Sequence, residues 1–202
     1  AGEPSSFRFG KEENPMIKIF IDQGHNPTNP NAGAEANGLR EQDITYDIGV
    51  RLANLLRANP NFDVRLSRNS PTEQLGTSNA SSLAARVNAA NSWGAQYFIS
   101  LHCNASTNTD ASGSEAYVYR LNSVAADLGE QLLIGLNNAT GLANRGVRAN
   151  PSLYVLRRTA MPAVLMEMGY LTNAHDAQLL SQDPQSFARG MYNGLLTYFG
   201  LD

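Results

Sequence analysis

Apolar residues are concentrated in three short and nearly continuous runs, at 16–22, 96–102 and 162–169. In the first run, residues 17–21 are β-branched or aromatic except for Lys18, as expected of a largely buried strand. Such runs are typical of the central strands of a parallel sheet that is covered on both faces. We therefore predict three buried strands, each followed by polar residues.

Between these runs, apolar residues recur at the spacing of helices. Ile44, Ile48, Leu52 and Leu55 form one stripe and predict a helix over 39–58. The remaining pattern predicts helices at 81–91, 123–139, 174–181 and 185–199, strands at 62–67, 114–119 and 153–156, and loops or connections at 23–38, 69–79, 105–113 and 141–151. Strands that alternate with helices indicate an α/β fold with a mainly parallel twisted sheet of about six strands and helices on both faces.

The chain has 202 residues, of which 42% are hydrophobic, enough for one compact domain with a sizeable core. Residues 1–15 are polar and lack periodicity, so we predict a loose N-terminal segment followed by one domain over 16–202. A net charge of −3 offers no electrostatic argument for nucleic acid or membrane as a partner. No apolar run approaches the roughly 20 residues that cross a bilayer. We expect no signal peptide in residues 1–4, which lack its basic and apolar regions.

Groups that can bind a metal or move protons end the three apolar runs or follow them closely: His25, His102 and Glu167. Because the carboxyl ends of parallel strands lie along one edge of a sheet, these groups can converge on one cleft. Glu41 adds a carboxylate that projects from the apolar stripe of the following helix. A carboxylate there is costly unless it is paired or bound to a metal, although stabilisation of the helix N-terminus is the alternative explanation.

Two imidazoles and one carboxylate form a ligand set of catalytic zinc, with one position left for water. Zinc lowers the pKa of that water and polarises a carbonyl, and amide hydrolysis also needs a group that moves protons. A second glutamate close to the metal suits that role. Glu167 lies in an apolar run, where partial burial raises the pKa of a carboxyl group. The residues alone leave open which of Glu41 and Glu167 is the ligand and which is the base.

Several other residues offer alternative chemistry. Cys103 suggests a nucleophile, but successive side chains of a strand point to opposite faces, so His102 should not activate it, and we expect a buried thiol. Glu35 in the long loop is a rival third ligand, and His175 is expected to be a solvated surface residue. Asp22 either orients a ligand imidazole or caps the turn, and both interpretations are open.

Four short blocks stand at 22–25, 38–41, 100–104 and 161–173, with the sequences DQGH, GLRE, SLHCN and MPAVLMEMGYLTN. Their sequences and their order resemble the zinc-dependent N-acetylmuramoyl-L-alanine amidases of the amidase type 3 family. Each block alone is weak, whereas the combination is highly specific. The resemblance covers about residues 16–200.

This resemblance implies that His25, Glu41 and His102 bind one Zn²⁺ per chain and that Glu167 is the catalytic acid/base. It implies cleavage of the amide that joins N-acetylmuramic acid to L-alanine of the stem peptide, so that peptidoglycan or muropeptides are the substrate. It also implies an extracellular or cell-wall location, for a chain that is secreted or released by lysis, and we expect a monomer.

Asn104 and Arg157 are candidate substrate contacts. Arg157 ends a segment that resembles the family's strand before the final motif; it could meet a carboxylate of the stem peptide, and a surface charge is the alternative. Asn26-Pro27 replaces the glycine pair that often follows the first histidine, which bears on the shape of the loop but not on the ligand. The loop at 105–113 is too short for the regulatory helix of division-associated relatives, so we predict an open site.

Two other functions use similar residues. A zinc carboxypeptidase-like peptidase is one, because similar ligands on an α/β sheet also serve peptide hydrolysis. A non-catalytic cell-wall-binding module is the other, and the intact set of four residues argues against it. The products released from muropeptides distinguish these functions from the amidase.

Overall fold

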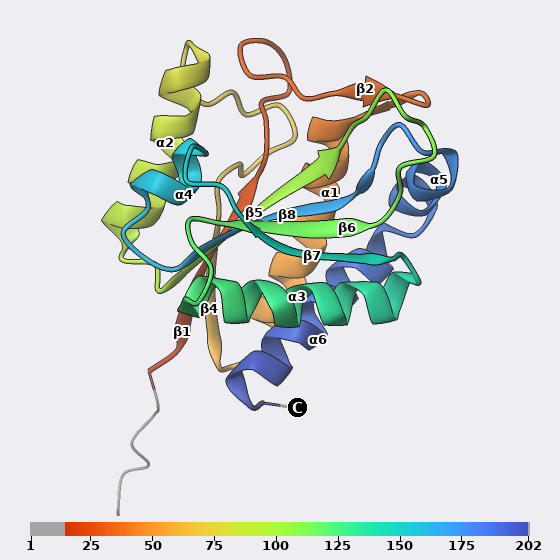
Figure 1. Ribbon diagram of the computed structural model, residues 1–202. Helices are drawn as coiled ribbons and strands as arrows, with labels where there is room; N and C mark the ends of the chain where they lie inside the picture. The colour runs from red at the N-terminus through yellow and green to blue at the C-terminus, as the bar shows by residue number, and fades with distance from the viewer. Residues whose placement is uncertain (1–14, 202) are drawn as a thin grey trace, which may run out of the picture.

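A twisted six-stranded sheet runs through the computed structural model, which describes residues 15–201 (Figure 1). Residues 1–14 and 202 lie outside the described range, and with them nearly all of the segment predicted at 1–15. The strands lie side by side in the order β4-β1-β5-β8-β6-β7. Their bounds are Ile17–Gln23 (β1), Phe62–Leu66 (β4), Tyr97–Asn104 (β5), Ser114–Val118 (β6), Asn144–Ala149 (β7) and Ala163–Tyr170 (β8).

Four neighbouring strands, β4, β1, β5 and β8, are parallel, and β6 and β7 run in the opposite direction. The predicted α/β fold with a mainly parallel sheet is therefore confirmed. Pairing in register sets His102 of β5 beside Glu167 of β8. The carboxyl ends of the parallel strands thus lie along one edge, as convergence of their end residues requires.

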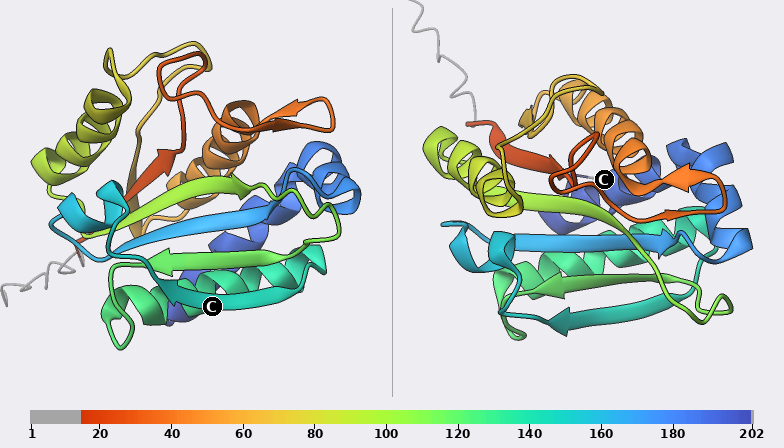
Figure 2. Two further views of the ribbon diagram at one scale, coloured as in Figure 1. Left: turned by 45° about the horizontal axis from the view of Figure 1, so that its top comes forward. Right: turned by 90° about the horizontal axis from the view of Figure 1, so that it is seen from above.

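Helices cover both faces of the sheet, as predicted (Figures 1 and 2). One face is covered by α1, α3 and α6, and the other by α2 and α4. The helices are α1 (Glu41–Arg57), α2 (Asn79–Trp93), α3 (Val124–Thr140), α4 (Tyr154–Arg158), α5 (Ala174–Gln182) and α6 (Pro184–Phe199). Among residues 15–201, none of these helices is both long enough and apolar enough to cross a bilayer.

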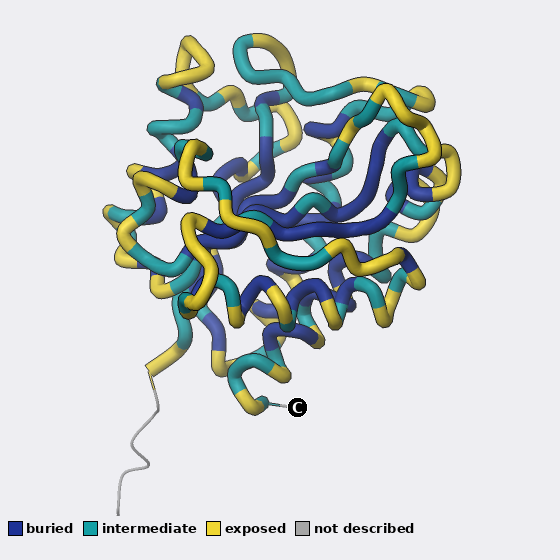
Figure 3. Tube along the Cα trace, viewed as in Figure 1, coloured by how far each residue is buried: buried dark blue, intermediate teal, exposed yellow. Residues whose placement is uncertain are grey.

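The central strands are apolar almost throughout because each of them contributes to two cores. In β1, Ile19 and Ile21 pack under α1 and its neighbours, whereas Phe20 packs on the opposite face with Phe98 and Val87. Figure 3 shows the resulting band of buried strands through the middle of the molecule. Alternate side chains of a strand point to opposite faces, so a strand between two helical layers needs apolar residues at nearly every position.

The prediction of a strand at 153–156 is wrong, because this segment begins the short helix α4. Its apolar residues Val155 and Leu156 pack into the core formed with α2. A run of four apolar residues is too short to distinguish a strand from a helix by its period. The sixth strand is instead β7, which lies inside the predicted connection at 141–151.

Two further differences concern the segment before α1. The predicted loop at 23–38 ends in a short antiparallel hairpin, in which Glu35–Ala36 (β2) pairs with Leu39–Arg40 (β3). The helix therefore begins at Glu41 rather than at residue 39. This start places Glu41 in the first turn of α1, directly after the hairpin.

Glycines allow α3 and α6 to approach each other closely. A Cβ atom at Gly190 of α6 would lie 2.7 Å from the carbonyl oxygen of Gly135 in α3. A Cβ atom at Gly194 would likewise collide with the carbonyl oxygen of Gln131. Gly129 differs, because its Cβ atom would meet only side chains, at 3.4 Å or more, which is ordinary van der Waals contact.

We predict that Gly190→Ala lowers the free energy of unfolding by about 1–3 kcal/mol, because the two helices must move apart to admit the methyl group. Gly129→Ala is the matched control. Its methyl group finds room, and alanine is favoured over glycine in a helix by about 1 kcal/mol, so its stability should be unchanged or higher. Urea-induced unfolding measures both variants, and equal stability of the two would contradict the close contact.

Candidate metal centre

His25, Glu41 and His102 lie together at the carboxyl edge of the sheet, with ligand atoms within 4.8 Å of one another. Nε2 of His25 is 3.1 Å from Oε1 of Glu41, and Nδ1 of His102 is 3.2 Å from the same oxygen. The two imidazole rings meet edge to face, with their centroids 4.9 Å apart. The fold thus brings into one cluster three residues that are far apart in the sequence.

A glycine turn delivers His25 to this cluster. The strands β1 and β5 pair in register as far as Gln23 and Leu101, so the residues after β1 lie beside the end of β5. A Cβ atom at Gly24 would lie 2.5 Å from the carbonyl oxygen of Leu101 and 2.5 Å from Cε1 of His102. His25 itself has a φ of 70°, a left-handed conformation that is uncommon outside glycine and is found at functional sites.

The carboxylate of Glu41 is buried, in agreement with its position on the apolar stripe of α1. The backbone N–H of Cys103 donates to Oε1 and that of Ala34 donates to Oε2, each at 3.0 Å. Burial raises the pKa of Glu41, but hydrogen bonds with His102 and His25 outweigh it and hold the pKa well below its ordinary value. Glu41 is therefore a buried, ionised carboxylate, and the helix dipole alone does not account for it.

Glu167 lies next to the cluster on the same face of the sheet. It is paired in register with His102, and paired residues of neighbouring strands point to the same face. Its Oε2 atom is buried and has no hydrogen-bond partner among residues 15–201. Burial raises the pKa of Glu167 well above its ordinary value, and the charges of Glu41 and Glu115 raise it further. A raised pKa makes a carboxyl group better able to hold a proton and to donate it in general acid catalysis.

The cluster has the composition of a metal site. Two imidazoles and an ionised carboxylate form a donor set that suits Zn²⁺ and leaves a position for water. In addition, Nδ1 of His25 is buried and has no hydrogen-bond partner within the described part of the chain. Because Glu41 rather than Glu167 belongs to the cluster, the geometry favours Glu41 as the ligand and Glu167 as the proton carrier.

A buried arginine of α2 holds the strand end that carries His25. Arg86 donates to Oδ1 of Asp22 at 2.8 Å, to the carbonyl oxygen of Gln23 at 2.6 Å and to that of His25 at 2.7 Å. Asp22 also accepts a hydrogen bond from Ser100 at 2.7 Å. Burial raises the pKa of Asp22, but Arg86 and Ser100 outweigh it and lower the pKa below its ordinary value. Asp22 therefore acts on the His25 loop through Arg86, and not by orienting an imidazole directly.

Arg86 is a buried residue beside the cluster whose contacts the sequence analysis missed. It lies on the apolar stripe of α2, at helical spacing from Leu83 and Ala90 and next to Val87. A charged residue on such a stripe is costly without a partner. The presence of a charged residue at an apolar position of the predicted helix could therefore have indicated a buried ion pair.

Of the two predicted substrate contacts, Asn104 lies near Glu167 and Arg157 does not lie in the cluster. Asn104 ends β5 and donates to Oε1 of Glu115, the register partner of Glu167, at 2.7 Å. Arg157 is exposed on α4 and donates to the carbonyl oxygen of Ser152 at 3.1 Å. This geometry agrees with the alternative interpretation of Arg157 as a surface charge.

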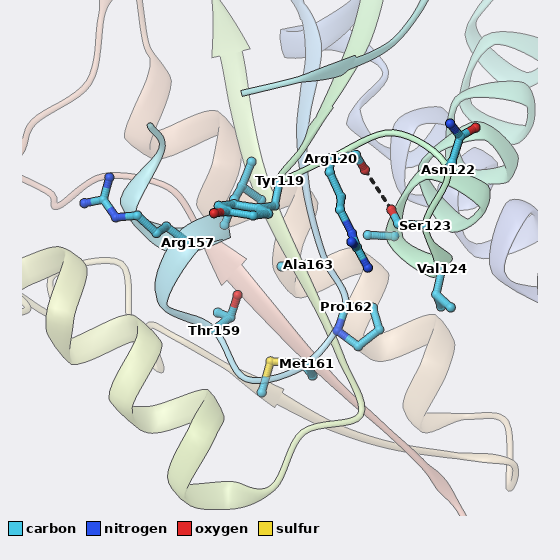
Figure 4. Close-up of a pocket in the computed structure, with 12 residues that line it drawn as sticks. Tyr119, Arg120, Asn122, Ser123, Val124, Arg157, Thr159, Met161, Pro162 and Ala163 are labelled. Atoms are coloured by element: carbon cyan, nitrogen blue, oxygen red, sulfur yellow. Dashed lines mark hydrogen bonds between the residues drawn. The ribbon is translucent and has the colours of Figure 1, made fainter. Parts of the chain in front are cut away.

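Arg157 borders a separate pocket of about 560 Å³, which Figure 4 shows in close-up. Pro162 and Ala163 at the start of β8 also line it. Ala163 precedes Glu167 by four residues, or about 13 Å along an extended strand. The pocket therefore lies at the other end of β8 and is not part of the metal centre.

The remaining candidates do not join the cluster. Glu35 is exposed and pairs with Arg40 at 3.7 Å, so it is not the third ligand. His175 is exposed at the start of α5, as predicted. Cys103 is buried, as predicted, and burial raises the pKa of its thiol well above the ordinary value, which makes it a poor nucleophile.

The cluster is open to solvent. The side chains of His25 and His102 are 21% and 18% exposed. A pocket of about 120 Å³ lies against both rings and against Tyr154 of α4. Residues 105–113 form a loop without a helix, as the short spacing predicted.

An open α/β sheet with a His/Glu/His cluster and an adjacent glutamate is compatible with a metal-dependent hydrolase, and comparison with known proteins assigns the family. The family profile described as N-acetylmuramoyl-L-alanine amidase matches residues 19–197. The chain is 40% identical over 190 residues to the N-acetylmuramoyl-L-alanine amidase CwlM of Bacillus licheniformis, covering 92% of this chain and 70% of that protein. It is 36% identical over 189 residues to a sporulation-specific N-acetylmuramoyl-L-alanine amidase of Bacillus subtilis (strain 168), covering 92% of this chain and 69% of that protein.

A solved structure shows the same fold. The catalytic domain of CwlV, an N-acetylmuramoyl-L-alanine amidase from Bacillus (Paenibacillus) polymyxa var. colistinus, matches with a TM-score of 0.81 at 30% identity, covering 93% of this chain and all of that one. The chain therefore belongs to the N-acetylmuramoyl-L-alanine amidase family. The predicted family and enzyme class are confirmed, and the family implies a peptidoglycan substrate.

We predict that Asp22→Asn lowers the free energy of unfolding by about 3–5 kcal/mol, because it leaves the buried charge of Arg86 unpaired. The pKa of Asp22 is lowered in the folded protein. Its contribution is therefore present above the ordinary aspartate pKa of about 4 and is lost as the pH falls through the folded value. The difference between wild type and variant should shrink below about pH 4. Urea-induced unfolding at several pH values measures both effects.

The matched control for this prediction is Asp47→Asn. Asp47 forms an exposed pair with Arg51 on α1, with the two atoms 3.0 Å apart. Loss of an exposed pair costs less than about 1 kcal/mol. A loss of stability as large as that of Asp22→Asn would contradict the importance of burial.

Proposed function

We propose that this chain is a zinc-dependent hydrolase that cleaves the amide between N-acetylmuramic acid and L-alanine of peptidoglycan stem peptides. The observation that carries the proposal is the cluster of His25, Glu41 and His102 with Glu167 beside it. The names of the similar amidases support the substrate, and the donor set supports zinc. In this proposal residues 16–202 are the catalytic domain, which acts as a monomer at the cell wall.

In this proposal His25, Glu41 and His102 hold the ion. When bound, zinc lowers the pKa of water and polarises a carbonyl group. The two backbone N–H groups that donate to Glu41 keep its carboxylate fixed and ionised. Its full negative charge then faces the ion in a buried environment, where charge interactions are stronger than in water.

Glu167 is proposed to take the proton of the attacking water and to pass it to the leaving nitrogen. The first step needs an ionised carboxylate and the second needs a carboxylic acid, so a pKa near the working pH serves both. Burial moves the pKa of Glu167 in that direction. Its Oε2 atom, which has no hydrogen-bond partner among the described residues, is a suitable acceptor for the proton.

Glu167→Gln should lower the turnover of purified peptidoglycan by about 10²–10⁴-fold, because the amide cannot accept the proton. Its zinc content should equal that of the wild type, because Glu167 is not in the ligand cluster. Release of L-alanine amino groups from muropeptides measures turnover, and atomic absorption measures zinc.

Glu130→Gln, at an exposed position of α3, is the control and should keep full activity. Liberation of single terminal amino acids, without new L-alanine amino groups, would contradict the amidase and favour a carboxypeptidase-like peptidase. Binding to sacculi without any turnover would favour a wall-binding module.

Removal of the metal should abolish activity, and added Zn²⁺ should restore it. Glu41→Gln should weaken zinc binding by more than the roughly 10–100-fold that loss of an outer-shell partner costs, because a neutral amide replaces the ionised ligand. Competition with a chromophoric chelator measures the affinity. Full activity of the metal-free protein would disprove the proposed role of zinc.

A further inference from the structure

A second group of charged residues lies on the two strands beyond Glu167. Glu115 of β6 is buried and is paired directly with Glu167 across the antiparallel strands. Directly paired residues share one face of a sheet, so the side chains of His102, Glu167 and Glu115 form a row across the strands. The row continues onto the edge strand β7 with Arg145 and Arg148.

Two neutral donors and two arginines surround the carboxylate of Glu115. Asn104 and the hydroxyl group of Tyr117 donate to Oε1, at 2.7 and 3.0 Å. Nε of Arg148 is 3.3 Å and Nε of Arg145 is 3.7 Å from Oε2. Two guanidinium groups thus face one carboxylate, and the group keeps a surplus positive charge.

This surplus charge is accessible to a ligand. The side chain of Arg148 is 53% exposed and that of Arg145 is 35% exposed, whereas that of Glu115 is only 5% exposed. The ring of Tyr170 lies under the guanidinium group of Arg145, 5.3 Å from centroid to Cζ, and supports it from the protein side. Glu115 therefore anchors both arginines while their side chains stay partly exposed, and Nη1 of Arg145 also donates to the carbonyl oxygen of Ser112 at 3.2 Å.

A β-bulge brings both arginines to this face. Residues three apart on a regular strand point to opposite faces, yet both guanidinium groups reach the same carboxylate oxygen. While β6 advances from Ser114 to Ala116, β7 advances one residue further, from Asn144 to Val147. Gly146 within this stretch has a φ of 86°. Bulges re-aim side chains and are common next to active sites.

The distance between Glu167 and the two arginines suits a peptide substrate. The edge strand β7 is separated from β8 only by β6, so it lies about 10 Å from β8 at about 4.8 Å per strand. An extended peptide advances about 3.3–3.6 Å per residue. The arginines therefore lie about two to three residues away from an amide that is held at Glu167.

We propose that Arg145 and Arg148 bind a carboxylate of the stem peptide, about two to three residues beyond the cleaved amide, and select acidic stems over amidated ones. Guanidinium groups form strong, directional hydrogen bonds with carboxylates and lose the charge-assisted part with carboxamides. Glu115 is a positioning residue that fixes the guanidinium groups before the substrate arrives. The inference rests on the proposed amidase function.

Two synthetic muropeptides of one sequence test the proposal, one with free stem carboxylates and one with carboxamides in their place. The zinc-loaded wild type should cleave the acidic peptide with a kcat/KM at least about tenfold higher. Arg145→Gln and Arg148→Gln should each raise KM for the acidic peptide about tenfold with little change in kcat, and should leave the amidated peptide unaffected. Arg148→Lys should lie in between, because it keeps the charge without the planar fork. Amidating one carboxylate at a time identifies the stem residue that is bound.

Arg51→Gln is the matched control, because Arg51 on α1 is similarly exposed at 39% and pairs with Asp47. Equal cleavage of both peptides by the wild type, or equal losses on both in the arginine variants, would overturn the proposal. Zinc content and thermal unfolding of each variant identify any general loss of structure. If the wild type cleaves neither peptide, the proposed amidase function itself is contradicted, and not the role of the arginines. Calorimetric binding of both peptides to Glu167→Gln then still tests the proposed role of the arginines. Equal affinities for the acidic and the amidated peptide would contradict that role.

Discussion

The buried carboxylate of Glu41 is the interaction on which the site depends. Its oxygens accept hydrogen bonds from the backbone of Cys103 and Ala34, and Oε1 lies within 3.2 Å of both imidazoles. One side chain of α1 thus joins the end of β5 to the loop at 23–38. A buried charge costs several kcal/mol unless it is compensated, so sheet, loop and helix must all be in place before this carboxylate is stable.

The His25 loop is fixed by a second buried charge, which comes from the opposite face of the sheet. Arg86 of α2 donates to the carbonyl oxygen of His25 and pairs with Asp22. These contacts hold His25 in a left-handed conformation that costs on the order of 1–3 kcal/mol. The centre therefore sits between two helices, with α1 supplying the anion and α2 supplying the cation that fixes the strand end.

The strong apolar runs were sufficient to predict the three central parallel strands and the residues at their ends, and the helical spacing of apolar residues predicted the helices on both faces. The edge strand Asn144–Ala149 escaped prediction, because Val147 is its one residue packed against the apolar core, within the described part of the chain. The segment at 153–156 was misassigned because four apolar residues carry no clear period.

The roles of Arg86 and Glu115 depend on pairings between distant segments, on a reversed strand and on a bulge. No local pattern encodes such contacts, although a charge on a buried stripe could have drawn attention to Arg86.

The row that begins at His102 crosses the strands instead of following one of them. A peptide that lies along it passes over β8, β6 and β7 in turn, so it leaves the molecule at the edge that β7 forms (Figure 2). In the proposed amidase reaction, the sugar on the other side of the cleaved bond would extend in the opposite direction, towards β1 and β4. One flank of the sheet would then face polysaccharide and the opposite flank peptide, so a glycan chain could run past the domain without having to thread through it.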